Sequence, residues 1–332
     1  MAENTNEPNE LNNPHDKFFK RALAIVAIAR PMLENFLPKD LLDKLNLDTL
    51  EIDPNSYIND ELKETFSDIV WACRLKNSNK KRKIAFLFEH KSYKPDYPHF
   101  QLIDYQRNSW RIQINEGQMP VPILPIIFYH GLEKWVVKPF ESYFGEVEAE
   151  MLQFLPSFNY ILINLQDYTE EQIRSINDIL LQKTLLGFKF YKDKDYLNDH
   201  IVELLFMGYG KLKNEQTYTF IRIFGVYLKA VSGMNQNEII IKSKKMDNIM
   251  ETEEFDIIEA LKEAFREDAI EEGIEKGLEK GLVIGIEKGK KISIYEASLR
   301  GHSLELLSNV FGLSVDTIKQ IIEEMKNDKE VS

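Results

Sequence analysis

Cysteine is nearly absent from this chain, and long apolar runs are absent altogether. Cys73 is the single cysteine among 332 residues, so an internal disulfide is excluded and a reducing compartment, most simply the cytoplasm, is favoured. No apolar stretch approaches the ~20 residues that a membrane-spanning helix needs. Residues 1–13 are polar and acidic, which argues against a secretory signal. We therefore expect a cytoplasmic protein without a membrane partner.

An excess of positive charge is also lacking, since the formal net charge is -12. The excess of acid is unevenly distributed, because residues 1–120 hold 17 Lys+Arg against 18 Asp+Glu. Phosphate contact depends on local charge as well as on the total. The basic run 80–83 is either a solvated hairpin tip or a surface for phosphates. The negative total therefore does not exclude nucleic acid.

Hydrophobic periodicity predicts an α/β fold. Apolar residues recur at helical spacing over 15–36, where Pro31 kinks or splits the helix, and a short helix is expected over 38–47. Runs rich in β-formers predict four strands, at 65–73, 84–89, 122–129 and 160–165. A helical period over 99–116 predicts a helix between the second and third of these strands. The order predicts a mixed sheet flanked by helices.

Composition shifts suggest further divisions along the chain. The expected parts are a disordered N-terminus (1–13), a core (14–165), an all-helical extension of that core (166–231), a polar linker (232–252), a charged helix with periodic glycine (253–292) and a helix-turn-helix-like hairpin (293–327).

Glycine occupies every fourth position from Gly273 to Gly289. Each glycine costs about 1 kcal/mol relative to alanine inside a helix. The stripe therefore indicates either close approach of another helix, hence a homo-oligomer, or a solvated tether. The hairpin after it places Asp316 and Glu323 among its lysines, so protein interaction is at least as well supported there as DNA binding.

Two acids and a lysine on the first and second predicted strands carry the chemistry. Asp68 lies in the first strand segment, and Glu89 and Lys91 close the second. Carboxylates on apolar strands must be paired, hydrogen-bonded or metal-bound. Mg²⁺ takes one or two protein carboxylates and completes its shell with water and phosphate. Lys91 shares a face with Glu89, where it can orient or deprotonate the attacking water. A buried structural ion pair is the equal alternative.

The helix that follows adds polar side chains near this constellation. Gln101 and Tyr105 share one face by their spacing, and Gln106 follows directly. We interpret Gln101 as helix surface and Tyr105 as core. Gln106 is the candidate to hold a phosphate or a water in the site.

The ordered motifs resemble a known family. The segments that carry the resemblance are 15–20 (HDKFFK), 60–62 (DEL), 67–70 (SDIV), 88–92 (FEHKS), 105–106 (YQ), 127–131 (IFYHG) and Trp135. Over residues 14–230 they resemble the Rpn family of bacterial recombination-promoting nucleases, also described as YhgA-like transposases. That family is similar to the PD-(D/E)XK nucleases, which implies a restriction-endonuclease-like core.

The resemblance also implies roles for residues. Asp68 and Glu89 would be metal ligands, and Gln106 an accessory residue of the site. Many members of the family have Gln at the position of Lys91. Lysine is the residue of the broader nuclease motif, so its presence favours activity. Ser67 stands where the broader motif has proline. Asp16, on the first helix, either assists the metal or caps that helix, and the N-cap is the favoured interpretation. His130 is interpreted as a hydrogen-bonded histidine in a turn.

The resulting expectation is a Mg²⁺-dependent DNA endonuclease, with Mn²⁺ as another metal, that promotes recombination or mobile-element processes. Two alternatives stay open. One is a catalytically inactive DNA-binding or assembly protein, because fold and motif do not guarantee turnover. The other is a transposase-like enzyme that transfers strands.

Overall fold

A computed structural model describes residues 13–52, 69–76, 83–208, 215–247 and 257–330. The chain divides into two compact units, Met1–Phe265 and Arg266–Ser332, and the division falls within one long helix. In the described residues, no helix combines the length and apolar character needed to span a bilayer.

The first unit contains a five-stranded mixed sheet. Its strands are β1 (Leu45–Ile52), β2 (Ile69–Leu75), β3 (Lys83–Lys91), β4 (Ile123–Tyr129) and β5 (Ile161–Asn164), in that spatial order. The pairs β1–β2 and β2–β3 are antiparallel, whereas β3–β4 and β4–β5 are parallel. Because β3 and β4 are parallel and Lys91 pairs with Tyr129, both strands end at the same edge of the sheet.

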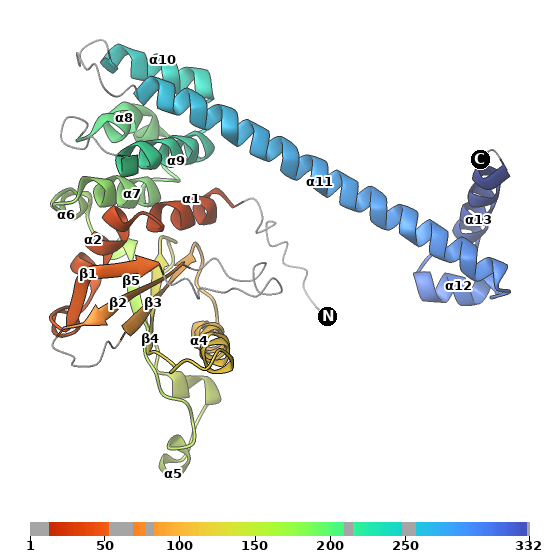
Figure 1. Cartoon of the computed structure of the whole chain (residues 1–332), viewed down its shortest axis with the longest axis horizontal. Helices are drawn as coiled ribbons and strands as arrows, with labels where there is room; N and C mark the ends of the chain where they lie inside the picture. Colours follow the sequence, from red (N-terminus) through yellow and green to blue (C-terminus); the bar gives the residue numbers. More distant parts are fainter. Residues whose placement is uncertain (1–12, 53–68, 77–82, 209–214, 248–256, 331–332) are drawn as a thin grey trace. The chain divides into compact units, whose positions relative to one another are not determined.

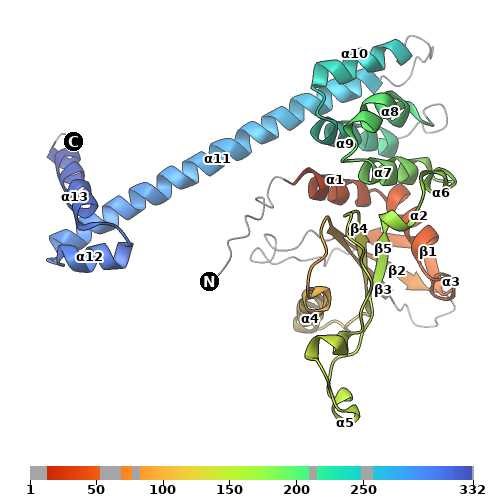
Figure 2. The ribbon, with the colours of Figure 1, turned by 180° about the vertical axis from the view of Figure 1, so that it is seen from behind.

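Helices cover both faces of this sheet (Figures 1 and 2). Those on one face are α1 (Pro14–Leu23), α2 (Val26–Phe36) and α7 (Ile179–Lys189), with α9 (Glu215–Ser232) packed on α1 and α7, while α4 (Pro98–Asn115) covers the other. Alternate side chains of β3 serve the two layers. Phe86 and Phe88 join the large core with α1 and α7, whereas Ala85 and Leu87 join the smaller core beneath α4.

Short helices and an outer helical layer complete the first unit. They are α3 (Lys39–Leu42), η2 (Phe140–Phe144), α5 (Ala149–Leu152), η3 (Leu165–Asp167), α6 (Glu170–Arg174), α8 (Lys194–Phe206) and α10 (Gln236–Asp247). The long helix α11 (Ile257–Leu299) leads into the second unit, which also contains α12 (Leu304–Phe311) and α13 (Val315–Glu330). Ile294, Leu307, Ile318 and Ile321 form the small core of that unit.

The expected α/β fold with a mixed sheet and a helical C-terminal region is confirmed, but the first expected helix breaks elsewhere. The break falls at Ile25, whose extended backbone has φ -89° and ψ 117°, and not at Pro31. Pro31 lies inside α2. A proline removes one helical hydrogen bond but does not always end the helix, so Pro31 alone does not locate the break.

Two further segments differ from the sequence prediction. Residues 45–47, expected at the end of a helix, begin β1, and buried Leu45 and Leu47 show the two-residue period of a strand. The polar segment 232–252, interpreted as a linker, contains α10. Ile239 and Ser243 of α10 are buried and lie four residues apart on one face of the helix. This buried face is narrow and includes a polar residue, so the sequence shows no clear apolar stripe.

Candidate functional site

The candidate site is centred on the C-terminal end of β3. Glu89 follows the apolar run 84–88 of β3, two residues before the strand ends, and is only 6% exposed. Lys91, two residues later on the same face, places its Nζ 2.6 Å from Glu89 Oε1. The structure thus brings together two of the predicted site residues. Burying two charged groups costs free energy of desolvation, so a buried ion pair at this strand end serves either a structural or a chemical role.

Asp68 lies outside the described residues, as do Ser67 and residues 80–82 of the basic run. The first described residue of β2 is Ile69, which pairs with Phe88, the neighbour of Glu89. The predicted metal-ligand role of Asp68 therefore stays a prediction.

Gln106 occupies a different place from the one expected. It is buried on α4, and its Nε2 donates a hydrogen bond of 2.9 Å to the carbonyl oxygen of Ile123. Ile123 pairs with Ala85, four residues before Glu89 and hence about 13 Å away along the strand. The structure does not bring Gln106 to Glu89. Its hydrogen bond ties α4 to the start of β4.

The other two residues singled out on α4 lie where the sequence predicted them. Gln101 is exposed on the helix surface, and Tyr105 is buried in the core between α4 and the sheet. Both interpretations are confirmed.

On the opposite face of the sheet, Asp16 and His90 interact directly. Asp16 Oδ1 forms a short hydrogen bond with His90 Nδ1. The N-cap of α1 is Asn13, whose side chain accepts from the backbone N–H of His15, so the reading of Asp16 as the cap was wrong. Asp16 points to β3 because it lies on the face of α1 that packs on the sheet. The sequence analysis assigned no role to His90, although strand alternation predicts that its side chain points to the other face of the sheet from Glu89.

Three histidines gather around this contact. The ring centroid of His130 lies 4.8 Å from that of His15 and 4.8 Å from that of His90. His15 Nδ1 also lies 3.1 Å from the hydroxyl oxygen of Tyr227. Within the described part of the chain, both ring nitrogens of His130 are buried without a hydrogen-bond partner. The expectation of a hydrogen-bonded histidine at position 130 is therefore corrected for its side chain.

The electrostatics of this cluster follow from burial and from its neighbours. Burial, helped by His90, lowers the pKa of His15 to about 4. Burial together with the nearby His90 and His15 lowers the pKa of His130 well below its ordinary value. For Asp16, burial raises the pKa, but the hydrogen bond from His90 and the positive charges of Lys20 and Lys91 outweigh it and lower the pKa overall. At neutral pH, Asp16 is therefore a carboxylate, and His15 and His130 are neutral.

The ligand atoms available on each face of the sheet decide which metal ion could bind there. No group of three or more His, Cys, Asp or Glu side chains is arranged to hold a metal ion within the described ranges. The histidine cluster therefore lacks the geometry of a transition-metal site. A single buried carboxylate such as Glu89 fits Mg²⁺, which needs only one or two protein carboxylates and takes its remaining ligands from water and phosphate.

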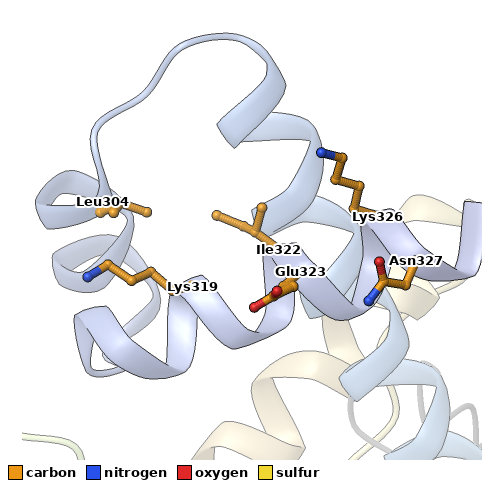
Figure 3. A pocket seen from close by; sticks show the side chains of 6 residues that line it. All are labelled: Leu304, Lys319, Ile322, Glu323, Lys326 and Asn327. Carbon is orange, nitrogen blue, oxygen red and sulfur yellow. The ribbon is translucent and has the colours of Figure 1, made fainter.

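The second unit contains a hollow of its own (Figure 3). Its volume is about 360 Å³, and it is lined by Leu304, Lys319, Ile322, Glu323, Lys326 and Asn327. Gly312, in the left-handed region with φ 63°, makes the turn between α12 and α13. The expected pair of helices around Gly312 is confirmed. The mixed charge of the hollow gives no reacting group comparable with Glu89 and Lys91.

Several known proteins are similar to this chain. Over 211 residues it is 26% identical to the Inactive recombination-promoting nuclease-like protein RpnE of Escherichia coli K12, covering 62% of this chain and 69% of that protein. It is 31% identical to the Recombination-promoting nuclease RpnD of Escherichia coli O157:H7 over 122 residues, or 36% and 46% of the two chains. It is 30% identical to the Recombination-promoting nuclease RpnA of Escherichia coli K12 over 123 residues, or 37% and 41%.

These matches differ in extent. The chain spans less than half the length of RpnD and RpnA, which are named as nucleases, and about two thirds of RpnE, which is named as inactive. No solved structure matches the chain. The family described as "Putative transposase, YhgA-like" matches residues 13–216, which is more than half of the sequence and includes Glu89, Lys91 and the three clustered histidines. The chain belongs to this YhgA-like family, as its motifs predicted.

Proposed function

We propose that this protein is a metal-dependent DNA endonuclease with a core of the PD-(D/E)XK type, and that it promotes recombination or the movement of DNA elements. The observation that carries the proposal is the buried Glu89 with Lys91 Nζ 2.6 Å away at the end of β3. Relatives named as recombination-promoting nucleases support it.

In this proposal Glu89 and Asp68 hold Mg²⁺ or Mn²⁺. When bound, the ion supplies Lewis acidity toward the phosphodiester and makes the attacking water more acidic. Glu89 suits this role because its carboxylate is held at the strand end with little exposure to water. Asp68 directly precedes Ile69 in the chain, and Ile69 pairs with the neighbour of Glu89.

Lys91 has a separate role in the proposed reaction. Its ammonium group lies on the face of β3 that carries Glu89, so it is placed to orient the attacking water and to stabilise charge that develops on the phosphate. The ion pair with Glu89 keeps the lysine positioned before a substrate arrives. Gln106, bound to the backbone at the other end of β4, contributes stability to the core instead.

A second candidate function is a DNA-binding or assembly protein without catalytic activity. The relative matched over the greatest length among those given above is named as inactive. In that case Glu89 and Lys91 would be a structural ion pair. A third candidate, strand transfer, would use the same residues with a DNA 3′-hydroxyl as the nucleophile.

Nicking of supercoiled plasmid by the full-length protein separates these functions. We expect nicking with Mg²⁺ or Mn²⁺ and none with EDTA. The variants Asp68→Asn, Glu89→Gln and Lys91→Met should each lower the rate by about 10²-fold or more, the usual loss when a charge-stabilising or acid–base group is removed. Asp104→Asn, an exposed acid on α4 that pairs with Arg107, is the matched control and should nick normally.

The outcomes are distinct. DNA binding without nicking under any of these metals would favour the inactive protein. Joining of added DNA ends would favour strand transfer. Full activity of Glu89→Gln would show that this carboxylate is structural.

A further inference from the structure

Four exposed aromatic side chains lie on the segments around the start of α4, which follows the candidate site in the chain. Tyr93 and Tyr97 belong to the loop after β3, Phe100 to the first turn of α4, and Phe144 to the end of η2. They are 52%, 57%, 38% and 44% exposed. We call these four residues the aromatic shelf. Exposed aromatic groups that gather in one place mark an interaction surface more often than isolated ones do.

The shelf has a firm support. The ring centroid of Phe100 lies 6.0 Å from that of Tyr97 and 6.3 Å from that of Phe144. Tyr143 backs these rings, with its centroid 5.5 Å from that of Tyr97, and a hydrogen bond of 3.0 Å links its hydroxyl group to His99 Nδ1. Buried Phe140 lies beneath, 5.2 Å from Phe100. The rings of Tyr97, Phe100 and Phe144 are therefore held in place before any ligand arrives.

The shelf begins beside the proposed catalytic residues. Lys91 Nζ lies 5.9 Å from the ring centroid of Tyr93, so the lysine that pairs with Glu89 also touches the first aromatic residue of the shelf. Tyr97 follows Tyr93 by four residues, which limits the span between them to about 14 Å. A strand whose phosphate lies at Lys91 would reach the shelf within a few nucleotides.

Cations lie beside the shelf as well. Lys94 and Lys138 line a hollow of about 90 Å³ together with Tyr143, and Asp96 is the acidic residue in its lining. A hollow needs about 10–15 Å³ of such space to hold one water, so about 90 Å³ has room for a phosphate group. Aromatic rings next to lysines form the combination by which proteins bind single strands, because bases stack on the rings while phosphates meet the cations.

We propose that the aromatic shelf stacks unpaired nucleobases of a DNA strand, so that the substrate of this site is DNA with unpaired nucleotides beside the scissile phosphate. A continuous duplex hides the faces of its bases and offers the shelf nothing to stack on, whereas single strands, loops and flaps expose them. The statement about cleavage rests on the proposed function, but the binding preference does not.

Binding is measured without catalysis, by fluorescence anisotropy of the full-length protein in EDTA. The probes are a labelled single-stranded DNA and the duplex of the same sequence. We expect tighter binding of the single strand. Tyr97→Ala and Phe144→Ala should each raise its Kd at least about 5-fold, as loss of one stacking ring does, and change the duplex Kd by less than about 2-fold.

Two controls separate stacking from structural damage. Phe154→Ala removes an exposed phenylalanine that follows α5 and should leave both Kd values unchanged. Tyr97→Phe keeps the ring and should retain single-strand binding. The loss caused by Tyr97→Ala should be similar at low and high salt, whereas Lys138→Gln should reduce the salt dependence of binding.

The inference is overturned if the wild type binds duplex as tightly as single strand, or if Tyr97→Ala weakens both equally. Tighter binding of single-stranded RNA of the same sequence would overturn the assignment to DNA. Absence of plasmid nicking with shelf-dependent binding intact would contradict the proposed function and leave the shelf standing. Normal nicking without a single-strand preference would contradict the shelf alone.

Discussion

Along β3, the side chains of Glu89 and Lys91 point to one face of the sheet and that of His90 points to the other. Glu89 and Lys91 were predictable as a pair, because strand alternation alone places residues two apart on one face. The partners of His90 were not, since Asp16 and His130 are distant in sequence and reach it only through the packing of α1 and the parallel pairing of β3 with β4. Local patterns therefore identify the candidate pair Glu89 and Lys91 but not the cluster on the other face of the sheet.

The histidine cluster makes acid instability a testable property of single residues. The folded pKa of His15 is about 4, and that of His130 lies well below its ordinary value. The ordinary value is about 6.5, so below that pH the unfolded chain binds protons that the folded chain does not, and the free energy of unfolding falls. For His15 this loss runs from pH 6.5 down to about 4, with an upper limit of about 1.4 kcal/mol per pH unit for each such histidine.

Urea unfolding at pH 7.5 and 5.5, followed by tryptophan fluorescence, checks this. All three tryptophans, Trp71, Trp110 and Trp135, lie in the first unit, so the signal reports on that unit. His130→Phe keeps a ring in the cluster but cannot take up a proton, so the variant should lose less free energy of unfolding between the two pH values than the wild type does. Between pH 7.5 and 8.5 the two proteins should show parallel behaviour. An equal loss at pH 5.5 would contradict the assignment.

At the scale of elements, strongly patterned segments were predictable and weakly patterned ones were not. The near-continuous apolar runs of β3 and β4 and the helical period of α4 stand out in sequence, as expected of elements buried in the sheet and its cover. The strand β1 has only Leu45 and Leu47 buried at its start, and α10 has a polar composition. Their structure depends on tertiary contacts, which override weak local preference.

The attachment of α4 to β4 gives a prediction at this scale. Gln106→Ala removes the donor of a buried hydrogen bond to Ile123 and leaves that carbonyl unsatisfied, which costs about 1–3 kcal/mol. Urea unfolding should show this loss, whereas Gln101→Ala on the exposed side of the same helix should stay within about 0.5 kcal/mol of the wild type.

The same variant separates a structural from a catalytic role for Gln106. Under conditions in which both proteins are folded, plasmid nicking by Gln106→Ala should remain close to the wild-type rate. A drop of about 10²-fold with the fold intact would instead place Gln106 in the reacting centre, as the family resemblance implied.

At the scale of the whole molecule, the family match ends at residue 216, so the C-terminal helices need an argument of their own. In α11 an apolar residue precedes each periodic glycine by three positions: Ile270, Ile274, Leu278, Leu282 and Ile286. Each is more than half exposed, and a Cβ added at any of the glycines from Gly273 to Gly289 would meet no atom of the same chain within 4 Å. Within the described chain, nothing therefore occupies this surface.

The stripe has the shape of a ridge beside a groove. Apolar side chains four residues apart form the ridge that helices use when they cross at about -50°, and the glycines leave a groove parallel to it. In a two-fold parallel pair, the ridge of one copy faces the groove of the other, and glutamates such as Glu275 then flank lysines such as Lys276 of the second copy. An antiparallel pair would set ridge against ridge. Self-association through α11 is therefore the better-supported alternative to a tether.

Gly281→Leu tests this without disturbing the isolated chain, because the added side chain meets no atom of its own molecule. Leucine also favours the helix by several tenths of a kcal/mol or more over glycine, so a loss of assembly would not reflect a weaker helix. Light scattering of the full-length protein over a range of concentrations should show a dimer for the wild type and for the control Lys280→Gln, and a monomer for Gly281→Leu. A wild-type monomer at every concentration would leave α11 as a solvated tether.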